Sequence, residues 1–281
     1  MASFTPHPTS WYAGDGWIEA LDQQTTPASI QLMAARVKGV PAWITPSWAL
    51  ESHVEASKLE GLCAELEAAP TPLVVCDLAP GLRGSWGPNW QVQTRHTRWL
   101  EADENGTFPT RPKHRTKQAR KGEERGLHIE ATKDLDVLLA LHQNARERKS
   151  IASDAGKLHK LLAWVLTSEH QSTYVVKDQT GTAIASATFL HDAGRTIYAF
   201  GGQLRSPFSG LATVMLIEQG ITDAGAIGNK IFDFGGSADP GVDRFYAEFG
   251  AEKHYRERAV RVAHWAKPWL KWMRPDLFVA K

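Results

Sequence analysis

The order of helix-like and strand-like segments after residue 126 constrains the fold of this chain more than any other feature. The stretch SDAGKLHKLLAWVLTSEH places leucine and valine at the spacing i, i+3, i+4, i+7 and i+8, which predicts a helix with one buried face. STYVVKD, AIASATFLHD and RTIYAFGGQ read as strands separated by the turn sequences DQTG and DAG, so they predict an antiparallel meander. The second half then runs β, α, α, β, β, β, α, β, α, β, which indicates a mixed α/β (α+β) fold.

The first hundred residues have a different texture. They carry seven of the eleven tryptophans, and prolines interrupt them repeatedly, so short strands and loops are expected rather than long helices. One helix is predicted at about 53–68, because HVEASKLEGLCAELEA places apolar residues on one face before Pro70. Strands are predicted at PLVVCDL and QVQTRHTRWLEA. We expect two domains, a tryptophan-rich one over 1–125 and a second over 126–281.

Composition and charge exclude several classes of protein. With 281 residues, of which 42% are apolar, the chain can bury a sizeable core. No apolar run reaches the length of about eighteen residues that a membrane span needs, and the N-terminus lacks a secretory signal, so a cytoplasmic protein without a membrane span is expected. Cys63 and Cys76 are expected to be buried thiols. The formal net charge of +1 argues against a globally basic nucleic-acid coat protein, and the scattered histidines predict no metal site.

The sequence FDFGGSADPGVDRFYAEFG, residues 232–250, reads as a buried strand that runs into a capped helix. Gly235 and Gly236 allow backbone conformations or close approaches that a side chain would block. Asp239 followed by Pro240 predicts the start of a helix, and Gly250 predicts its end. Taken alone, the stretch is also compatible with an ordinary strand-to-helix turn.

This stretch resembles the signature of the Fem-type peptidoglycan aminoacyltransferases and their acetyltransferase-like relatives. The matching residues are Phe232, Asp233, Phe234, Gly236, Gly241, Val242, Phe245, Tyr246, Phe249 and Gly250. The basic segment RPKHRTKQARKGEERGLHIE resembles a second segment of that family, with Arg115, Arg120, Lys121, Gly126 and Leu127 in comparable places. The similarity covers roughly residues 111–262.

The resemblance implies a particular fold and activity. It implies tandem GNAT-like domains, each a mixed, largely antiparallel sheet flanked by helices, with the first domain shortened and degenerate. It also implies that the sheet is splayed between its fourth and fifth strands, and that a ligand cleft lies between the two halves. The implied activity is that of a bacterial-type N-acyltransferase.

Two positions depart from the family pattern. Tyr246 occupies the place of the family's lysine, and a tyrosine supplies no fixed cation. The pyrophosphate-binding loop of ordinary GNAT enzymes is only partly represented by GGQLRSPFSGLA. In that stretch Gln203, Arg205, Ser209 and Gly210 are the candidates for binding acyl-CoA, because donors at a helix N-terminus bind phosphate groups.

Acyl transfer to an amine needs a deprotonated amine and a stabilised oxyanion. Asp233 is the first candidate for orienting or deprotonating the amine, and Tyr246 for giving a proton to the leaving group. Their alternative roles are a hydrogen-bonded structural carboxylate and a core tyrosine. The expected substrate-binding residues are Arg115, Lys117, Arg120, Lys121, Ser237 and Arg244. The alternative for the basic residues is a solvated connector helix, and the alternative for Ser237 is turn chemistry.

Two functions are consistent with these residues. The first is an N-acyltransferase that uses acyl-CoA as co-substrate and acts on a small-molecule amine or a cell-wall-precursor-like acceptor, with aminoacyl-tRNA as the other donor to consider. The second is a catalytically inactive GNAT-like protein that binds a ligand or a partner protein, which the two departures favour. The tail AHWAKPWLKWMRPDLFVAK is expected to pack on the tryptophan-rich domain or to touch a membrane surface.

Overall fold

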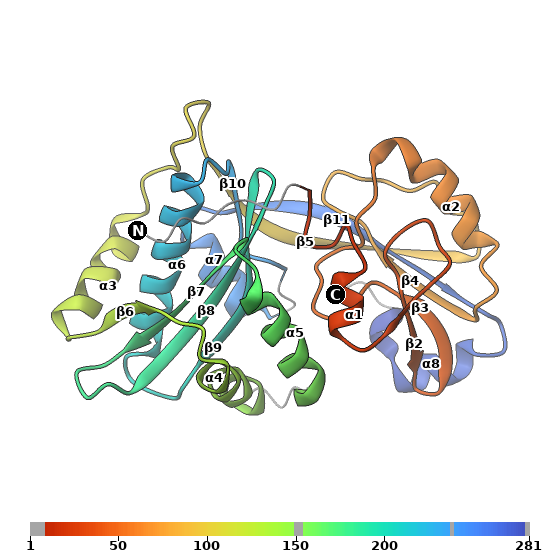
Figure 1. Cartoon of the computed structure of the whole chain (residues 1–281). Helices are drawn as coiled ribbons and strands as arrows, with labels where there is room; N and C mark the ends of the chain where they lie inside the picture. Colours follow the sequence, from red (N-terminus) through yellow and green to blue (C-terminus); the bar gives the residue numbers. More distant parts are fainter. Residues whose placement is uncertain (1–8, 149–153, 237–238, 279–281) are drawn as a thin grey trace. The chain divides into compact units, whose positions relative to one another are not determined.

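A computed structural model describes residues 9–148, 154–236 and 239–278 of the chain (Figure 1). The chain divides into two compact units. Unit 1 comprises Met1–Trp11, Arg98–Gly235 and Pro240–Glu252, and unit 2 comprises Tyr12–Thr97, Gly236–Asp239 and Lys253–Lys281. This division differs from the single boundary expected after residue 125. The basic helix α3 (Lys113–Glu124) belongs to unit 1, and the C-terminal helix α8 (Lys267–Met273) belongs to unit 2.

Unit 1 is built around a mixed, largely antiparallel sheet in the strand order β5, β10, β9, β8, β7, β6. These strands are the C-terminal end of β5 (Trp90–Glu101), β6 (His128–Ala131), β7 (Gln171–Lys177), β8 (Ala183–Asp192), β9 (Arg195–Gln203) and β10 (Ile231–Asp233). The strands β7, β8 and β9 form the predicted antiparallel meander. The short strand β10 runs parallel to β9 and antiparallel to β5.

Helices cover both faces of the sheet in unit 1. Successive residues of a strand point to opposite faces, and β8 shows which helix covers which face. Phe189 packs with Ile217 of α6 (Ser209–Ala226), whereas Thr188 lies beside His142 of α4 (Leu135–Arg148). The helix α5 (Ala155–Thr167) packs beside α4, and α3 packs beside α6. The apolar stripe that predicted α5 is buried in full.

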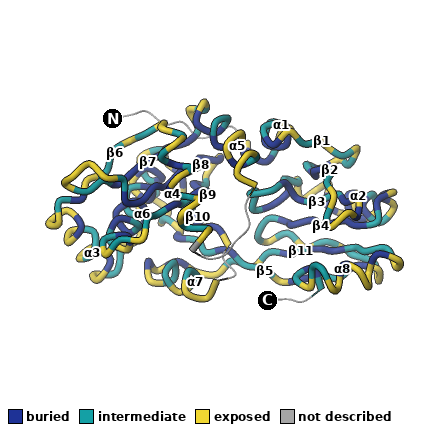
Figure 2. The backbone as a smooth tube through the Cα atoms, turned by 90° about the horizontal axis from the view of Figure 1, so that it is seen from below, coloured by how far each residue is buried: buried dark blue, intermediate teal, exposed yellow. Residues whose placement is uncertain are grey.

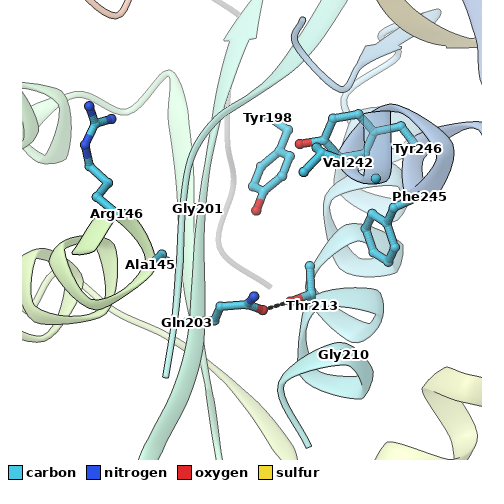
Figure 3. Close-up of a pocket in the computed structure, with 12 residues that line it drawn as sticks. Ala145, Arg146, Tyr198, Gly201, Gln203, Gly210, Thr213, Val242, Phe245 and Tyr246 are labelled. Carbon is cyan, nitrogen blue, oxygen red and sulfur yellow. Dashed lines mark hydrogen bonds between the residues drawn. The ribbon is translucent and has the colours of Figure 1, made fainter. Parts of the chain in front are cut away.

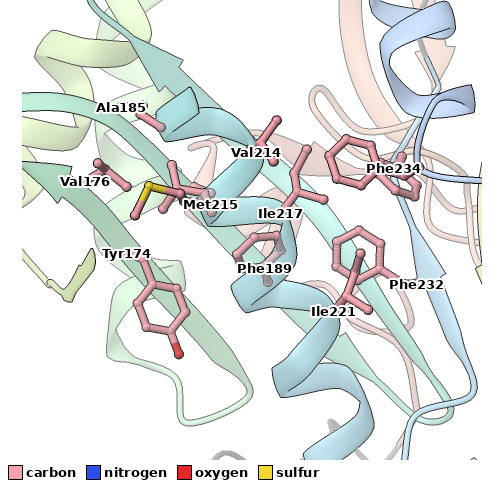
Figure 4. Packing of buried hydrophobic residues seen from close by; sticks show 14 of the residues in the cluster. Tyr174, Val176, Ala185, Phe189, Val214, Met215, Ile217, Ile221, Phe232 and Phe234 are labelled. Atoms are coloured by element: carbon pink, nitrogen blue, oxygen red, sulfur yellow. The ribbon is translucent and has the colours of Figure 1, made fainter. Parts of the chain in front are cut away.

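An aromatic cluster forms the core of unit 1 next to β10 (Figure 4). The ring centroids of Phe232 and Phe234 lie 4.9 Å apart, and those of Phe189 and Phe232 lie 5.8 Å apart. All three rings are buried. Burial of such a side chain contributes roughly 2 to 3 kcal/mol, so this cluster holds β10 firmly although the strand is only three residues long.

Unit 2 contains the short strands that its prolines predicted. Its sheet has the order β1, β2, β3, β4, β11, β5. The strands are β1 (Gln24–Thr25), β2 (Met33–Val37), β3 (Val40–Ile44), β4 (Leu73–Asp77), β11 (Glu252–Val262) and the N-terminal part of β5, and the helical segments are α1 (Gly16–Ala20), η1 (Ala56–Lys58), α2 (Leu59–Glu67), α8 and η2 (Pro275–Leu277). The helix predicted at 53–68 is thus a 3₁₀ turn followed by α2.

The core of unit 2 lies around β4. Cys63 of α2 and Cys76 of β4 are both buried free thiols, as expected. The C-terminal tail packs on this unit through Leu270 of α8 and Leu277 of η2, which confirms the expected packing onto the tryptophan-rich region. Figure 2 shows that the opposite side of α8 is exposed. Among the helices of the described residues, none combines the length and apolar character needed to cross a bilayer.

Candidate functional site

A pocket with a volume of about 410 Å³ lies within unit 1 (Figure 3). It is bounded by β9, by the C-terminal end of α4, by the first turns of α6 and by α7 (Pro240–Ala247). Its polar and aromatic lining residues are Arg146, Tyr198, Gln203, Thr213, Phe245 and Tyr246.

The pocket exists because the sheet opens between β9 and β10. The pairing of these strands ends at Asp233 and Ile197, and no described strand pairs with this edge of β9 from Tyr198 to Gln203. After Asp233 the chain stays with β5, since the amide of Phe234 donates to the carbonyl of Arg98. The resemblance implied a sheet splayed between its fourth and fifth strands, which are β9 and β10 when counted from β6, and the observed register agrees with that prediction.

Asp233 produces this opening and is not part of the pocket. Its side chain is fully buried, and Oδ1 accepts a hydrogen bond of 2.8 Å from the amide of Gly235, which has a positive φ of 72°. This is the arrangement in which an aspartate stabilises a turn. Its Oδ2 lies 3.4 Å from Nη1 of Arg195, which also binds Asp192. The structure thus places the carboxylate in its own turn and ion pair, outside the pocket, as the structural alternative expects, and the catalytic role of Asp233 remains a prediction.

Tyr198 points into the pocket from β9 (Figure 3). Its ring packs edge-on against Tyr246 of α7, with centroids 6.4 Å apart. No hydrogen-bond partner for the Tyr198 hydroxyl occurs among the described residues. Burial raises the pKa of Tyr198 to about 12. The phenol therefore keeps its proton at neutral pH and can donate it to a ligand.

A pair of glycines brings α4 against β9. A side chain at Gly202 would come within 2.5 Å of the backbone nitrogen of His142, so only glycine permits this approach. Nδ1 of His142 lies 3.2 Å from the carbonyl oxygen of Gly201. Burial is the main cause that lowers the pKa of His142, and the nearby Arg146 adds to it. The imidazole is thus neutral at neutral pH and fixes the position of the strand that carries Tyr198.

The N-terminus of α6 forms a second wall of the pocket. Gly210 lines the pocket, and among the described residues no acceptor contacts the amides of Gly210 and Leu211. Free amides and the helix dipole favour an anionic group at such a position. Gln203 also lines the pocket, and its Oε1 accepts a hydrogen bond of 2.9 Å from Thr213. This bond leaves the amide nitrogen of Gln203 as a donor.

The other residues expected to bind acyl-CoA have different surroundings. The hydroxyl of Ser209 is buried and donates to the carbonyls of Leu204 and Ser206, so it shapes the turn before α6. Arg205 is exposed and does not line the pocket. Only Gln203 and Gly210 of the four expected residues meet at the pocket.

Tyr246 and Phe245 of α7 line the pocket, and Arg115 of α3 packs against Phe245. The guanidinium of Arg115 lies 4.4 Å from the ring centroid of Phe245 and 4.7 Å from that of Phe249. It also donates to the carbonyl of Phe245 and to Glu248. Arg115 is buried, and this burial lowers its pKa against the opposing effect of Glu248. These contacts join α3 to α7 and to Glu248 and Phe249, which follow it, and Arg115 does not line the pocket. Its expected substrate-binding role remains a prediction.

The remaining basic candidates face solvent. Lys117, Arg120 and Lys121 are exposed on α3 and do not line the pocket, and Arg120 pairs with Glu124 of the same helix. Arg244 is exposed on α7, 3.9 Å from Glu248. Ser237 lies outside the described residues.

Tyr198 and Arg146 are among the pocket residues that were not predicted from the sequence. Tyr198 stands three residues before the Gly201–Gly202 pair, and a tyrosine followed by glycines on a strand was the available signal. Arg146 lies near the C-terminal end of α4, where burial lowers its pKa. Figure 3 shows both side chains, Tyr198 from β9 and Arg146 from α4.

Comparison with known proteins identifies the fold. No protein-family model matches the sequence, and no curated protein is similar to it in sequence. Among solved structures, the chain is similar to FemX, with a TM-score of 0.64 at 12% identity over 96% of each chain. It is also similar to L-PGS from Bacillus licheniformis, with a TM-score of 0.65 at 10% identity over 94% of this chain and 92% of that one.

A third structure is the C-terminal domain of a putative lysylphosphatidylglycerol synthetase from Agrobacterium fabrum. Its TM-score is 0.61 at 10% identity, over 94% of this chain and 91% of that one. The chain therefore has the fold of FemX and of these synthetase domains. This confirms the fold that the sequence resemblance to the Fem-type proteins implied.

Proposed function

We propose that this protein is an acyltransferase that transfers an acyl or aminoacyl group to an amine in the pocket of unit 1. One observation carries the proposal: the sheet opens at β9, and the Tyr198 phenol points into the resulting pocket. A protonated hydrogen-bond donor beside the reacting carbonyl is what the developing oxyanion of acyl transfer requires. The fold shared with FemX and L-PGS supports this reaction class.

The acyl donor is expected to bind along β9 and the N-terminal end of α6. We propose acyl-CoA as the donor, with its phosphates at the amides of Gly210 and Leu211 and with Gln203 as a further hydrogen-bond donor. The acyl chain would then lie along the unpaired edge of β9. Aminoacyl-tRNA is the alternative donor, and the exposed Lys117, Arg120 and Lys121 of α3 would contact its phosphates.

Tyr198 is the residue we assign to the chemistry. The amine nitrogen attacks the carbonyl carbon, the new C–N bond forms, and the bond from that carbon to the leaving group breaks. The Tyr198 hydroxyl gives its proton to the leaving group, and the phenolate that results takes a proton from the attacking nitrogen. Because burial raises the pKa of Tyr198 to about 12, the phenol is available as a donor rather than as a base. Tyr246 orients the Tyr198 ring by edge-on packing.

The acceptor belongs to the same proposal. We expect a small-molecule amine or a cell-wall-precursor-like amine, in the cytoplasm of a bacterial cell. The lining of the pocket includes Val242 and Phe245, so the part of the acceptor next to the amine is expected to be apolar.

The test begins with ligand binding. Thermal-shift measurements with acetyl-CoA, longer acyl-CoAs, UDP-sugars and aminoacylated tRNA identify the ligand, and turnover is then assayed with a panel of amines. We expect Tyr198→Phe to lower kcat/KM by ~10²- to 10⁴-fold with little change in stability. The matched control is Tyr255→Phe, since Tyr255 is exposed in unit 2.

The outcomes separate the two candidate functions. Turnover that depends on Tyr198 supports the acyltransferase. A ligand that binds in the pocket and is never turned over would support the catalytically inactive binding protein instead. Binding to none of the donors would contradict the proposed reaction class.

A further inference from the structure

The C-terminal helix exposes an unusual set of side chains. Among the described residues only five large apolar side chains are exposed, and three of them are tryptophans within the eight residues from 265 to 272. Trp265, Trp269 and Trp272 have exposed fractions of 69%, 46% and 72%. Single exposed apolar residues need no explanation, whereas a cluster of large aromatic side chains marks an interaction surface.

The fold of unit 2 does not account for these tryptophans. The helix α8 is anchored by Ala266 and Leu270, which are fully buried against β3, β4 and β11 together with Leu277. That face fills the core, whereas Trp269 and Trp272 of α8 and Trp265, which precedes the helix, are exposed, and polar residues would serve the stability of unit 2 equally well at these positions.

The exposed rings are held in place by local contacts. The centroids of Trp269 and Trp272 lie 5.5 Å apart. Nε1 of Trp269 donates a hydrogen bond of 3.0 Å to the carbonyl of Lys38, in the turn between β2 and β3. That turn is tight, with positive φ at both Lys38 and Gly39. The surface is therefore ordered before any partner binds.

Cations surround the rings. Lys38, Lys267 and Lys271 are exposed, and none of them forms an ion pair among the described residues. Lys267 and Lys271 are one helical turn apart. The segment 258–275 contains no aspartate or glutamate, so no carboxylate of α8 offsets these charges. We call Trp265, Trp269, Trp272, Lys38, Lys267 and Lys271 the tryptophan surface.

We propose that the tryptophan surface docks this protein on anionic phospholipid bilayers. Indole rings combine an apolar body with a polar N–H and prefer the boundary between headgroups and acyl chains. Lysines beside them attract the anionic headgroups of the same leaflet. The association is peripheral, with α8 lying in the plane of the interface and the core face of the helix still packed on unit 2. This inference stands on unit 2 alone and does not depend on the proposed reaction in unit 1.

The experiment uses the full chain and sedimentation with vesicles. The vesicles contain either phosphatidylcholine alone or phosphatidylcholine mixed with phosphatidylglycerol. We expect binding to the anionic vesicles only, with a loss of binding at high salt because salt screens the lysines. Trp265→Ala combined with Trp272→Ala is expected to weaken binding by roughly tenfold or more. Lys267→Gln combined with Lys271→Gln is expected to weaken it by a similar factor of about tenfold.

The controls remove the same number of charges or a comparable ring elsewhere. Lys113→Gln combined with Lys117→Gln takes two exposed lysines from α3, and Tyr255→Ala takes an exposed ring from β11. Both are expected to bind vesicles as the wild type does. Thermal unfolding of every variant is expected to match the wild type, since all of these side chains are exposed.

Three results would overturn the proposal. The first is no binding to anionic vesicles, and the second is a loss of binding in the α3 variant as large as in the α8 lysine variant. The third is self-association without lipid, measured by sedimentation velocity, that the two tryptophan substitutions abolish. In that last case the surface is an interface between copies of this chain.

Discussion

At the side of the pocket, the phenol of Tyr198 occupies the space that a side chain at residue 201 would fill. A methyl group at Gly201 would overlap the phenol oxygen of Tyr198, so the side chain of Tyr198 reaches its position only because residue 201 has none. The strand β9 thus presents the phenol and provides the room for it. This relationship can be tested without changing Tyr198 itself.

We expect Gly201→Ala to displace the Tyr198 phenol and to lower activity as strongly as Tyr198→Phe does, by ~10²-fold or more. The free energy of unfolding should change little, because the displaced group is the far end of a flexible side chain. The control is Gly61→Ala, at an exposed position of α2 where nothing lies within 4 Å of the added methyl group. Equal activity of Gly201→Ala and the wild type would remove Tyr198 from the mechanism.

Asp233→Asn is expected to destabilise unit 1 rather than to block chemistry. The asparagine amide cannot accept from both Gly235 and Arg195, so the ion pair between residue 233 and Arg195 is lost. We expect a loss of about 2 to 3 kcal/mol in the free energy of unfolding, measured with urea. Asp136→Asn, at an exposed position in the first turn of α4, should change it by less than about 0.5 kcal/mol. Full stability combined with abolished turnover would support a catalytic role for Asp233.

Arg115 and Arg120 lie on the same helix and should behave differently. Arg115→Ala removes the stacking on Phe245 and Phe249 and the hydrogen bond to the Phe245 carbonyl, at a cost of about 2 to 3 kcal/mol in urea unfolding. Arg120→Ala breaks one exposed pair with Glu124 and should cost less than about 0.5 kcal/mol. If Arg120→Ala instead weakens binding of the donor at unchanged stability, the exposed face of α3 contacts the substrate.

His191 makes the stability of unit 1 sensitive to acid. Burial, with a smaller contribution from His170, lowers the pKa of His191 to about 4, and its ring contacts Thr196 and Ser172. A depressed pKa means that the stabilisation is complete above the unfolded pKa near 6.5 and is lost as the pH falls toward 4. The shift in the pKa of His191 corresponds to roughly 3 kcal/mol of the free energy of unfolding, which is lost as the pH falls through that window.

The measurement for His191 is urea unfolding at several pH values between neutral and 4. His191→Gln should be less stable than the wild type at neutral pH and should lose less stability on acidification. His128→Gln is the control, because His128 is exposed, and its pH dependence should match the wild type. Parallel curves for wild type and His191→Gln would show that other groups cause the acid sensitivity.

Local sequence patterns were sufficient to predict several of the helices and strands of unit 1. The spacing of Leu158, Leu161, Leu162 and Val165 predicted α5, and these residues are buried. The meander was predicted from turn residues because such turns fix which strands are neighbours. The boundaries of the two units could not be predicted in this way, because they depend on where β5 and β11 pair. Pairing between distant segments leaves no local signal in the sequence.

The site was harder to predict than the fold. The sequence placed Asp233 at the end of a buried strand, and it did not show that Arg195 of β9 pairs with its carboxylate. Tyr198 resembled a core residue because its strand is apolar, and only the end of β10 at Asp233 leaves a pocket beside it. The apolar content of the C-terminal segment likewise predicted that it packs on unit 2, but it did not predict which of its residues are exposed to solvent.

By itself the sequence determined the helix α5, the meander of β7, β8 and β9 and the start and end of α7, because periodicity, proline, glycine and aspartate act over a few residues. Tertiary structure alone decided which polar groups are enclosed and which are available, since burial and pKa depend on segments far apart in the chain. The buried Asp233 and the available Tyr198 differ for that reason.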